Sequence, residues 1–95
     1  MVVAACAEDS RTVSIFDPVY REQTRELSMG VSSCRADVEA EVVETATEVR
    51  VTVTATGGLA EDCADGLEVQ LDQPLDGRQV VDGASGQALE VTLSR

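Results

Sequence analysis

Strict alternation of apolar and polar residues in the middle of the chain restricts what this sequence can fold into. Arginine or threonine separates the apolar members of one such stretch, which are Val49, Val51, Val53 and Ala55. A repeat of two places alternate side chains on opposite faces of a β-strand, and β-branched residues favour that conformation. Because a lone strand leaves its backbone polar groups without partners, this stretch predicts a neighbouring strand and therefore a sheet.

The preceding stretch, residues 38–42, alternates in the same way, with valine or alanine on one side and glutamate on the other. Together the two stretches predict a β-hairpin whose turn lies at residues 44–47. A helix is the alternative for the first stretch, because Val38, Val42 and Ala46 also recur at helical spacing. We favour the strand, because the second stretch needs a partner beside it.

Shorter alternating stretches on both sides of the hairpin predict further strands, with turn-forming residues between them. These stretches are residues 12–16, 27–31, 67–71, 79–81 and 89–93. Asp17 and Pro18 are expected to end the first of them, and residues 20–23 to form a loop or a single helical turn. The whole pattern predicts an all-β fold, a small antiparallel β-sandwich or open barrel of about seven short strands.

The length of the chain limits it to one small domain. It has 95 residues, of which 43% are hydrophobic, so its core is modest. With one phenylalanine and one tyrosine, that core depends on valine, leucine, isoleucine and alanine. Residues 1–10 show no periodicity and are expected to be a leader or the remnant of a lipobox, and residues 11–95 are expected to form a single β domain.

The charge of the chain narrows the range of partners. Eighteen acidic residues against seven basic ones give a formal net charge of −11. This charge repels phosphate backbones and anionic lipid head groups, so nucleic acid is a poor candidate partner.

The chain contains no histidine and no lysine, which removes the usual activating bases of nucleophilic catalysis. Three cysteines without histidine do not complete a structural zinc site. We therefore expect no enzyme activity, no metal and no cofactor. The alternative is a carboxylate-dependent hydrolase with Asp62 and Asp65 as its acid and base. Together with Glu61 these residues are also a weak calcium candidate, although a solvated acidic loop is the simpler interpretation.

Cys34 and Cys63 flank the hairpin, one before it and one after it, where a bridge would tie its base to the next strand. We predict a disulfide between them, because three cysteines in so short a chain indicate an oxidising compartment. Closing a loop of this length would stabilise the fold by roughly 3–4 kcal/mol. The alternative is two buried thiols in a cytosolic protein.

Cys6 follows Val3, Ala4 and Ala5, an arrangement that resembles a bacterial lipobox. In a lipobox, small residues precede the cleavage site and the cysteine thiol carries the lipid anchor. A working signal also needs a basic and an apolar segment upstream, so Met1 is expected to lie inside a longer signal peptide. The alternative is an ordinary exposed cysteine near a frayed N-terminus.

The order of cysteines and turns resembles that of small actinobacterial secreted proteins and lipoproteins. The matching features are Cys34 before the hairpin, Cys63 within an acidic loop at 62–66, and turns at 71–78 and 81–83. The resemblance covers roughly residues 33–86 and consists of turn chemistry and cysteines. It implies an exported, disulfide-linked β domain, often tethered by an N-terminal cysteine, and it implies no reaction.

Arg78 is one of seven cations and lies between Asp76 and Asp82 in the sequence. We predict that it forms a structural ion pair that holds two turns together, with a carboxylate-binding site as the alternative. The threonine row within residues 52–56 is interpreted as the ordinary outward face of an antiparallel strand.

These features predict an exported, non-catalytic module of the cell envelope or cell surface with a structural disulfide. Its expected location is extracellular or in the envelope, with Cys6 as the candidate lipid attachment point. Its expected partner is a protein or a cell-wall component. Contact with a membrane is expected only through a lipid on Cys6.

Overall fold

The computed structural model describes residues 10–32, 37–57 and 64–94 of the chain. Within these ranges the backbone forms nine strands and no helix, so the predicted all-β class is confirmed. Among the described residues there is therefore no helix that is long and apolar enough to cross a membrane. Except for Ser10, which begins the first strand, the expected leader lies outside the described residues.

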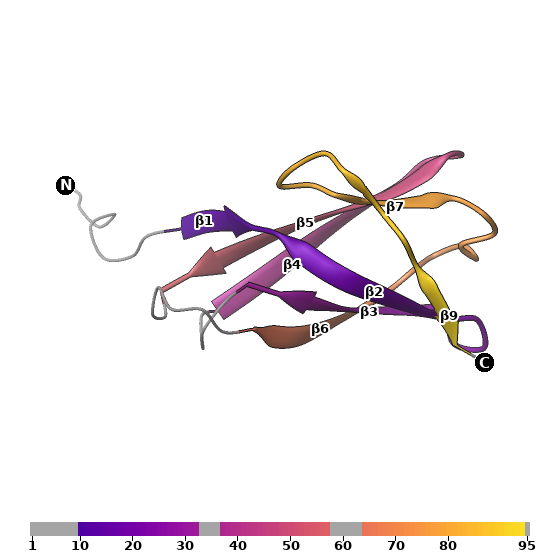
Figure 1. Cartoon of the computed structure of the whole chain (residues 1–95), viewed down its shortest axis with the longest axis horizontal. Coiled ribbons are helices and arrows are strands. Elements are labelled where there is room, and N and C mark those ends of the chain that lie inside the picture. The colour runs from indigo at the N-terminus through magenta and orange to yellow at the C-terminus, as the bar shows by residue number, and fades with distance from the viewer. Residues whose placement is uncertain (1–9, 33–36, 58–63, 95) are drawn as a thin grey trace.

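The strands divide into two sheets, which Figure 1 shows as the two layers of the molecule. The first sheet contains β1 (Ser10–Val13), β4 (Asp37–Glu44), β5 (Glu48–Thr56), β7 (Gln79–Asp82) and β8 (Ala88–Leu89). The second sheet contains β2 (Ile15–Arg21), β3 (Glu26–Val31), β6 (Asp65–Gln70) and β9 (Thr92–Ser94). The described residues thus form nine short strands, against about seven expected.

β5 is the central strand of the first sheet. β4 pairs with β5 along its whole length, in the predicted hairpin. On the opposite edge of β5, β1 pairs with the second half and β7 with the first half. The β5–β7 pair is parallel, as is the β2–β9 pair in the second sheet, so each sheet is mixed and not purely antiparallel.

The chain passes from one sheet to the other at Ser14, between β1 and β2. Val13 pairs with Val53 in the first sheet, and two residues later Ile15 pairs with Val31 in the second. A strand that changes sheets in this way closes one corner of a sandwich. The short β1–β2 segment therefore links both layers directly.

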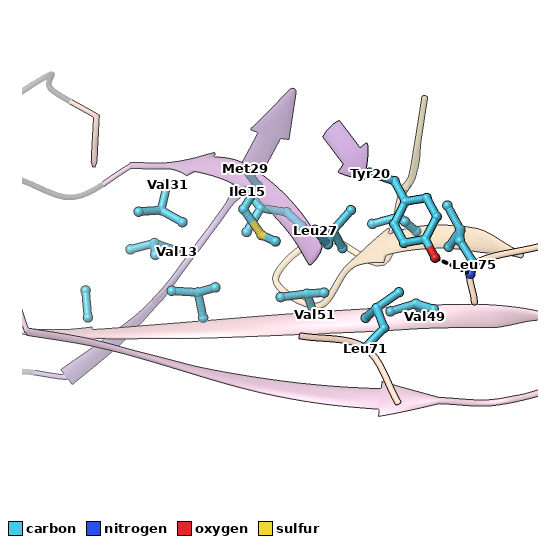
Figure 2. Packing of buried hydrophobic residues seen from close by; sticks show 13 residues of the cluster. Val13, Ile15, Tyr20, Leu27, Met29, Val31, Val49, Val51, Leu71 and Leu75 are labelled. Atoms are coloured by element: carbon cyan, nitrogen blue, oxygen red, sulfur yellow. Dashed lines mark hydrogen bonds between the residues drawn. The ribbon is translucent and has the colours of Figure 1, made fainter. Parts of the chain in front are cut away.

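The core lies between the two sheets, and Figure 2 shows its valine and leucine side chains facing one another. The inward face of β5 is completely buried, at Val49, Val51, Val53 and Ala55. This is the alternating set that the sequence placed on one face. The opposite sheet contributes a second set, which is Ile15, Tyr20, Leu27, Met29 and Val31.

Tyr20 is the one aromatic residue of this core. Its hydroxyl accepts a hydrogen bond from the Leu75 amide at 3.2 Å, the dashed contact in Figure 2. A buried phenol needs such a partner, because an unpaired hydroxyl in the interior is destabilising. This bond ties the segment after β6 to β2.

The prediction that Asp17 and Pro18 end the first strand was wrong. β2 continues to Arg21, past both residues, and residues 20–21 are strand where a loop was expected. The pairing with β3 shifts between Phe16 and Val19, and Asp17 has a φ of 50°. A bulge accommodates a proline within a sheet because it takes that residue out of the hydrogen-bond ladder.

The last predicted strand, residues 89–93, is divided in two. β8 ends at Leu89 and pairs with β7 in the first sheet. β9 begins at Thr92 and pairs with β2 in the second. The alternation of Leu89, Val91 and Leu93 thus spans a crossing between sheets, and Leu93 is 57% exposed.

Gly83 follows β7 and lies against the backbone of β5. Its amide donates to the Val51 carbonyl at 2.8 Å. A Cβ at Gly83 would overlap the Thr52 side chain and would lie 2.9 Å from the Thr52 Cα. The Thr52 backbone cannot retreat, because β5 is held by strands on both edges. Gly83 is therefore required by this close approach.

We expect Gly83→Ala to lower the free energy of unfolding by about 1–3 kcal/mol, the usual cost of forcing a methyl group into packed structure. Urea denaturation followed by circular dichroism measures this difference. Gly66→Ala is the matched control, because a Cβ there would meet no atom within 4 Å. Its effect should stay within about 0.5 kcal/mol. Equal losses in the two variants would contradict the close contact at Gly83.

Candidate functional site

The candidate site is the turn that carries Arg78, between β6 and β7. Two residues with positive φ, Asp76 at 48° and Gly77 at 82°, reverse the chain there. Glycine adopts this conformation without a steric penalty, and aspartate tolerates it better than most residues. The Arg78 amide closes the turn by donating to the Leu75 carbonyl at 2.9 Å. The Arg78 side chain is thereby directed back toward the β4–β5 turn.

The Arg78 guanidinium is surrounded by oxygen atoms from two segments of the chain. Its Nη2 donates to Glu44 Oε1 at 3.1 Å, and its Nη1 donates to the Thr45 carbonyl at 3.2 Å. Its other acceptors are the carbonyls of Gln73, Pro74 and Leu75, at 3.1, 2.7 and 3.1 Å. All three guanidinium nitrogens are therefore occupied within the fold.

Glu44, the last residue of β4, receives hydrogen bonds from the other side of this cluster. Its Oε2 accepts from the Asp72 amide at 2.8 Å, and its Oε1 accepts from the Gln73 amide at 3.3 Å. The side chains of Arg78 and Glu44 are only 10% and 15% exposed. Burial acts to raise the pKa of the Glu44 carboxyl, but these amides and the Arg78 guanidinium outweigh it and lower the pKa.

The expected acidic partners of Arg78 were Asp76 and Asp82, and that expectation was wrong. Among the described residues, the ion-pair partner of Arg78 is Glu44. Asp82 is buried and accepts hydrogen bonds from the Ala84 amide and the Ser85 hydroxyl, both at 3.0 Å. Asp76 is exposed on its turn. Arg78 instead joins its own turn to the β4–β5 turn, through Glu44 and the Thr45 carbonyl.

An open depression of about 470 Å³ lies beside this cluster. It is lined by residues of the two turns, which are Glu44, Thr45, Ala46, Gln73, Pro74, Asp76 and Arg78. Its two strongest polar groups, the Arg78 guanidinium and the Glu44 carboxylate, already bind each other and the backbone. A carboxylate ligand would have to displace these bonds, so the arrangement favours a structural clamp.

The lowered pKa makes the contribution of Glu44 to stability depend on pH. A carboxyl group whose pKa is lower in the folded state stabilises the fold above its unfolded pKa, here about 4.5. That stabilisation is lost as the pH falls through the folded pKa. Between about pH 6 and pH 3, the wild-type protein should therefore lose more stability than Glu44→Gln, which cannot titrate at this position.

Urea denaturation of both proteins at each pH tests this prediction. The comparison is needed because protonation of the other carboxylates also changes repulsion within this acidic chain. Those groups titrate in both proteins, so the difference between the two curves reports Glu44. A constant difference over the whole pH range would contradict the prediction.

The outer face of the first sheet carries the threonine row. Thr52, Thr54 and Thr56 on β5 stand opposite Glu41, Glu39 and Asp37 on β4. The threonines are half-buried between their neighbours, whereas the three acidic residues are exposed. The threonine row is therefore an ordinary outward strand face, and the more accessible feature is the acidic strand beside it.

The remaining predicted site residues lie outside the described residues. They are Cys6, Cys34, Glu61, Asp62 and Cys63. Of the predicted acid and base pair, Asp65 alone is described, as the exposed first residue of β6. The part of the chain that the structure describes contains no group of three or more acidic, cysteine or histidine residues placed to hold a metal ion.

Glu44 is the residue of the clamp that sequence reasoning missed. It was placed at the start of the predicted turn, with no role assigned. Its signal is weak, because an acidic residue at the end of an acidic strand does not stand out.

Comparison with protein-family models, curated proteins and solved structures found no match to this chain.

Proposed function

We propose that the chain is a non-catalytic binding module of the cell envelope or cell surface, exported and stabilised by a disulfide between Cys34 and Cys63. The distribution of charge over the fold carries this proposal. Each described arginine either donates to a carboxylate or backbone carbonyl of the fold or forms an ion pair within it, and these are Arg11, Arg21, Arg25, Arg50 and Arg78. On β4, by contrast, Asp37, Glu39 and Glu41 form no ion pair among the described residues. These exposed carboxylates are therefore available to a partner with positive charge, which supports a role in binding.

The positions of the strand ends support the proposed disulfide. Val31, at the end of β3, pairs with Asp65 at the start of β6. Asp37, at the start of β4, pairs with Thr56 at the end of β5. The connection from β3 to β4 contains Cys34, and the connection from β5 to β6 contains Cys63. Both connections begin and end beside each other, because β3 pairs with β6 and β4 pairs with β5. A bridge between them would tie both sheets at one end of the sandwich.

The intact mass of protein from its native host tests the proposal, with free thiols alkylated before reduction. We expect Cys34 and Cys63 to escape alkylation, and we expect a lipid increment on Cys6 if the lipobox resemblance holds. Fractionation of the same cells should place the protein in the envelope or the medium. A cytosolic protein with three alkylated cysteines would overturn export and the disulfide together.

A further inference from the structure

β4 is an edge strand, and β5 is its pairing partner in the sheet. The Val51 carbonyl accepts from Gly83 on the far edge of β5, which shows that Val51 directs its backbone groups away from β4. Residues of an antiparallel ladder alternate between facing their partner strand and facing away. Val42, which stands opposite Val51, therefore directs its amide and carbonyl to the open edge. The same alternation applies to Ala40 and Val38.

The two faces of this edge differ in chemistry. Val38 and Val42 are half-buried against the core, while Ala40 between them is exposed. On the other face, Glu39 and Glu41 are exposed and form no ion pair among the described residues. Apolar and acidic side chains thus alternate along an edge whose outward backbone groups pair with no other described strand.

A strand added to this edge would lie beside both the apolar and the acidic side chains of β4. Its residues opposite Val38, Ala40 and Val42 would extend the apolar inner face. Its alternate residues would stand beside Glu39 and Glu41, at the spacing where cross-strand side chains are closest. Opposite charges at such positions stabilise a pair, whereas like charges destabilise it. The complementary occupant therefore alternates basic and apolar residues.

We propose that the edge of β4 from Val38 to Val42 binds an extended peptide segment of a partner protein in which lysine or arginine alternates with apolar residues. This inference rests on the proposed function as a binding module and names the chemistry of its partner. Main-chain hydrogen bonds to an open edge are a general mode of peptide recognition, with side chains supplying the specificity.

A second copy of the chain fits this edge poorly. Two β4 strands side by side would bring the glutamates of both copies together, and acidic residues on an edge protect against such pairing. At the end of this edge, the Glu44 side chain is already occupied, because it accepts from the amides of Asp72 and Gln73. The edge strand of the second sheet, β6, differs from β4 in that its Glu68 carboxylate already accepts a hydrogen bond from the Ser28 hydroxyl.

Binding of a synthetic peptide in which lysine and valine alternate to the purified protein tests the proposal. Fluorescence anisotropy gives the affinity, and amide NMR shifts locate the binding. We expect the largest shifts at Val38, Ala40 and Val42, with affinity falling as salt is added. The same peptide with N-methyl groups on the amides that face β4 keeps its charge and loses its donors. It should not bind.

Two variants separate the backbone contribution from the charge. Ala40→Pro removes an amide that faces the open edge, so the β4–β5 ladder remains complete, and proline is tolerated on edge strands. It should weaken binding by at least about tenfold, because the loss of this hydrogen-bond donor is added to the steric block of the proline ring. Glu39→Gln with Glu41→Gln should weaken binding by about three- to tenfold and flatten its salt dependence. Glu22→Gln with Glu90→Gln removes the same charge elsewhere and should leave the affinity unchanged.

Equal binding of the N-methylated peptide, or equal weakening by both double variants, would show attraction to overall charge and overturn the edge site. Absence of binding by the lysine–valine peptide would overturn it as well. A dimer of the free chain that Ala40→Pro abolishes would assign the edge to a second copy instead. If Ala40→Pro does not fold, the N-methylated peptide still decides the question.

The edge site and the proposed function can fail independently, because peptide binding tests the first and cellular location tests the second. A cytosolic protein that binds the lysine–valine peptide at β4 would overturn export and leave the edge site standing. An envelope protein that binds no such peptide would overturn the edge site and leave the location standing.

Discussion

Replacement of Arg78 by alanine should lower the free energy of unfolding by about 3 kcal/mol, because removal of one partner of a nearly buried ion pair leaves the other charge uncompensated. Glu44 would keep its two amide donors and lose its guanidinium. The carbonyls of Thr45, Gln73, Pro74 and Leu75 would lose a donor at the same time. In a domain whose whole stability is about 5–10 kcal/mol, this loss is large.

Arg21→Ala is the matched control for this experiment. Arg21 also pairs with a glutamate, Glu26, but at 3.7 Å and with its own side chain 53% exposed. Surface pairs of this kind contribute little, so its loss should cost less than about 1 kcal/mol. Urea denaturation of both variants gives the comparison. Similar unfolding midpoints for Arg78→Ala and Arg21→Ala would show that the clamp is not a major source of stability.

Arg78→Lys distinguishes the charge of the side chain from its shape. Lysine restores a cation beside Glu44, but its single ammonium cannot reach acceptors on two turns in the way that the planar guanidinium does. We expect it to recover less than half of the stability lost in Arg78→Ala. Full recovery would show that charge alone accounts for the role of Arg78.

Leu27→Ala is expected to be the other strongly destabilising substitution, with a cost of about 2–5 kcal/mol. Leu27 is fully buried on β3, where its register partners are Tyr20 on β2 and Val69 on β6. Of these two neighbours, Tyr20 is held by the hydrogen bond of its hydroxyl and Val69 has a short, branched side chain. They cannot reach far enough to fill the space that three missing carbon atoms leave.

The control for this cavity is Leu93→Ala on β9. It removes the same atoms from a side chain that is 57% exposed, so the change should stay within about 0.5 kcal/mol. Urea denaturation and thermal melting both report the difference. If Leu27→Ala proved as mild as Leu93→Ala, the tight packing between the two sheets would be contradicted.

The parts of the fold that were predictable from sequence are those with one buried and one exposed face. The hairpin of β4 and β5 and the strand at Glu26–Val31 have this character, so their period of two is visible in the residues. Residues 16–19 are different, because a bulge interrupts the period and a buried Pro18 imitates a strand end.

The order of the strands was not predictable, for a related reason. Alternation indicates which face of a strand is buried and carries no information about its neighbour. The parallel pairs β5–β7 and β2–β9 join segments that are distant in the chain and separated by several turns. Such pairs need long connections, which leave no local signal of the kind that a hairpin turn does.

The candidate site shows the same limit at the level of single residues. Arg78 was recognised as a cation that holds turns together, because few cations occur in the chain. Its partner was sought among nearby acidic residues, whereas Glu44 precedes it by 34 positions. The two meet because the β4–β5 turn and the β6–β7 connection fold against each other, which depends on the assembled sandwich.

The parallel pairing of β2 and β9 has a consequence for how the domain would respond to mechanical load. Figure 1 shows β1 and the end of β9 near opposite ends of the molecule. Tension between these two points would act along the strands, so that the bonds joining residues 19–21 to 92–94 are sheared together and do not open one after another. Ser14, where the chain changes sheets, would pass part of that tension to β5 through β1. A domain tethered at one terminus and pulled at the other would therefore resist extension with both of its layers.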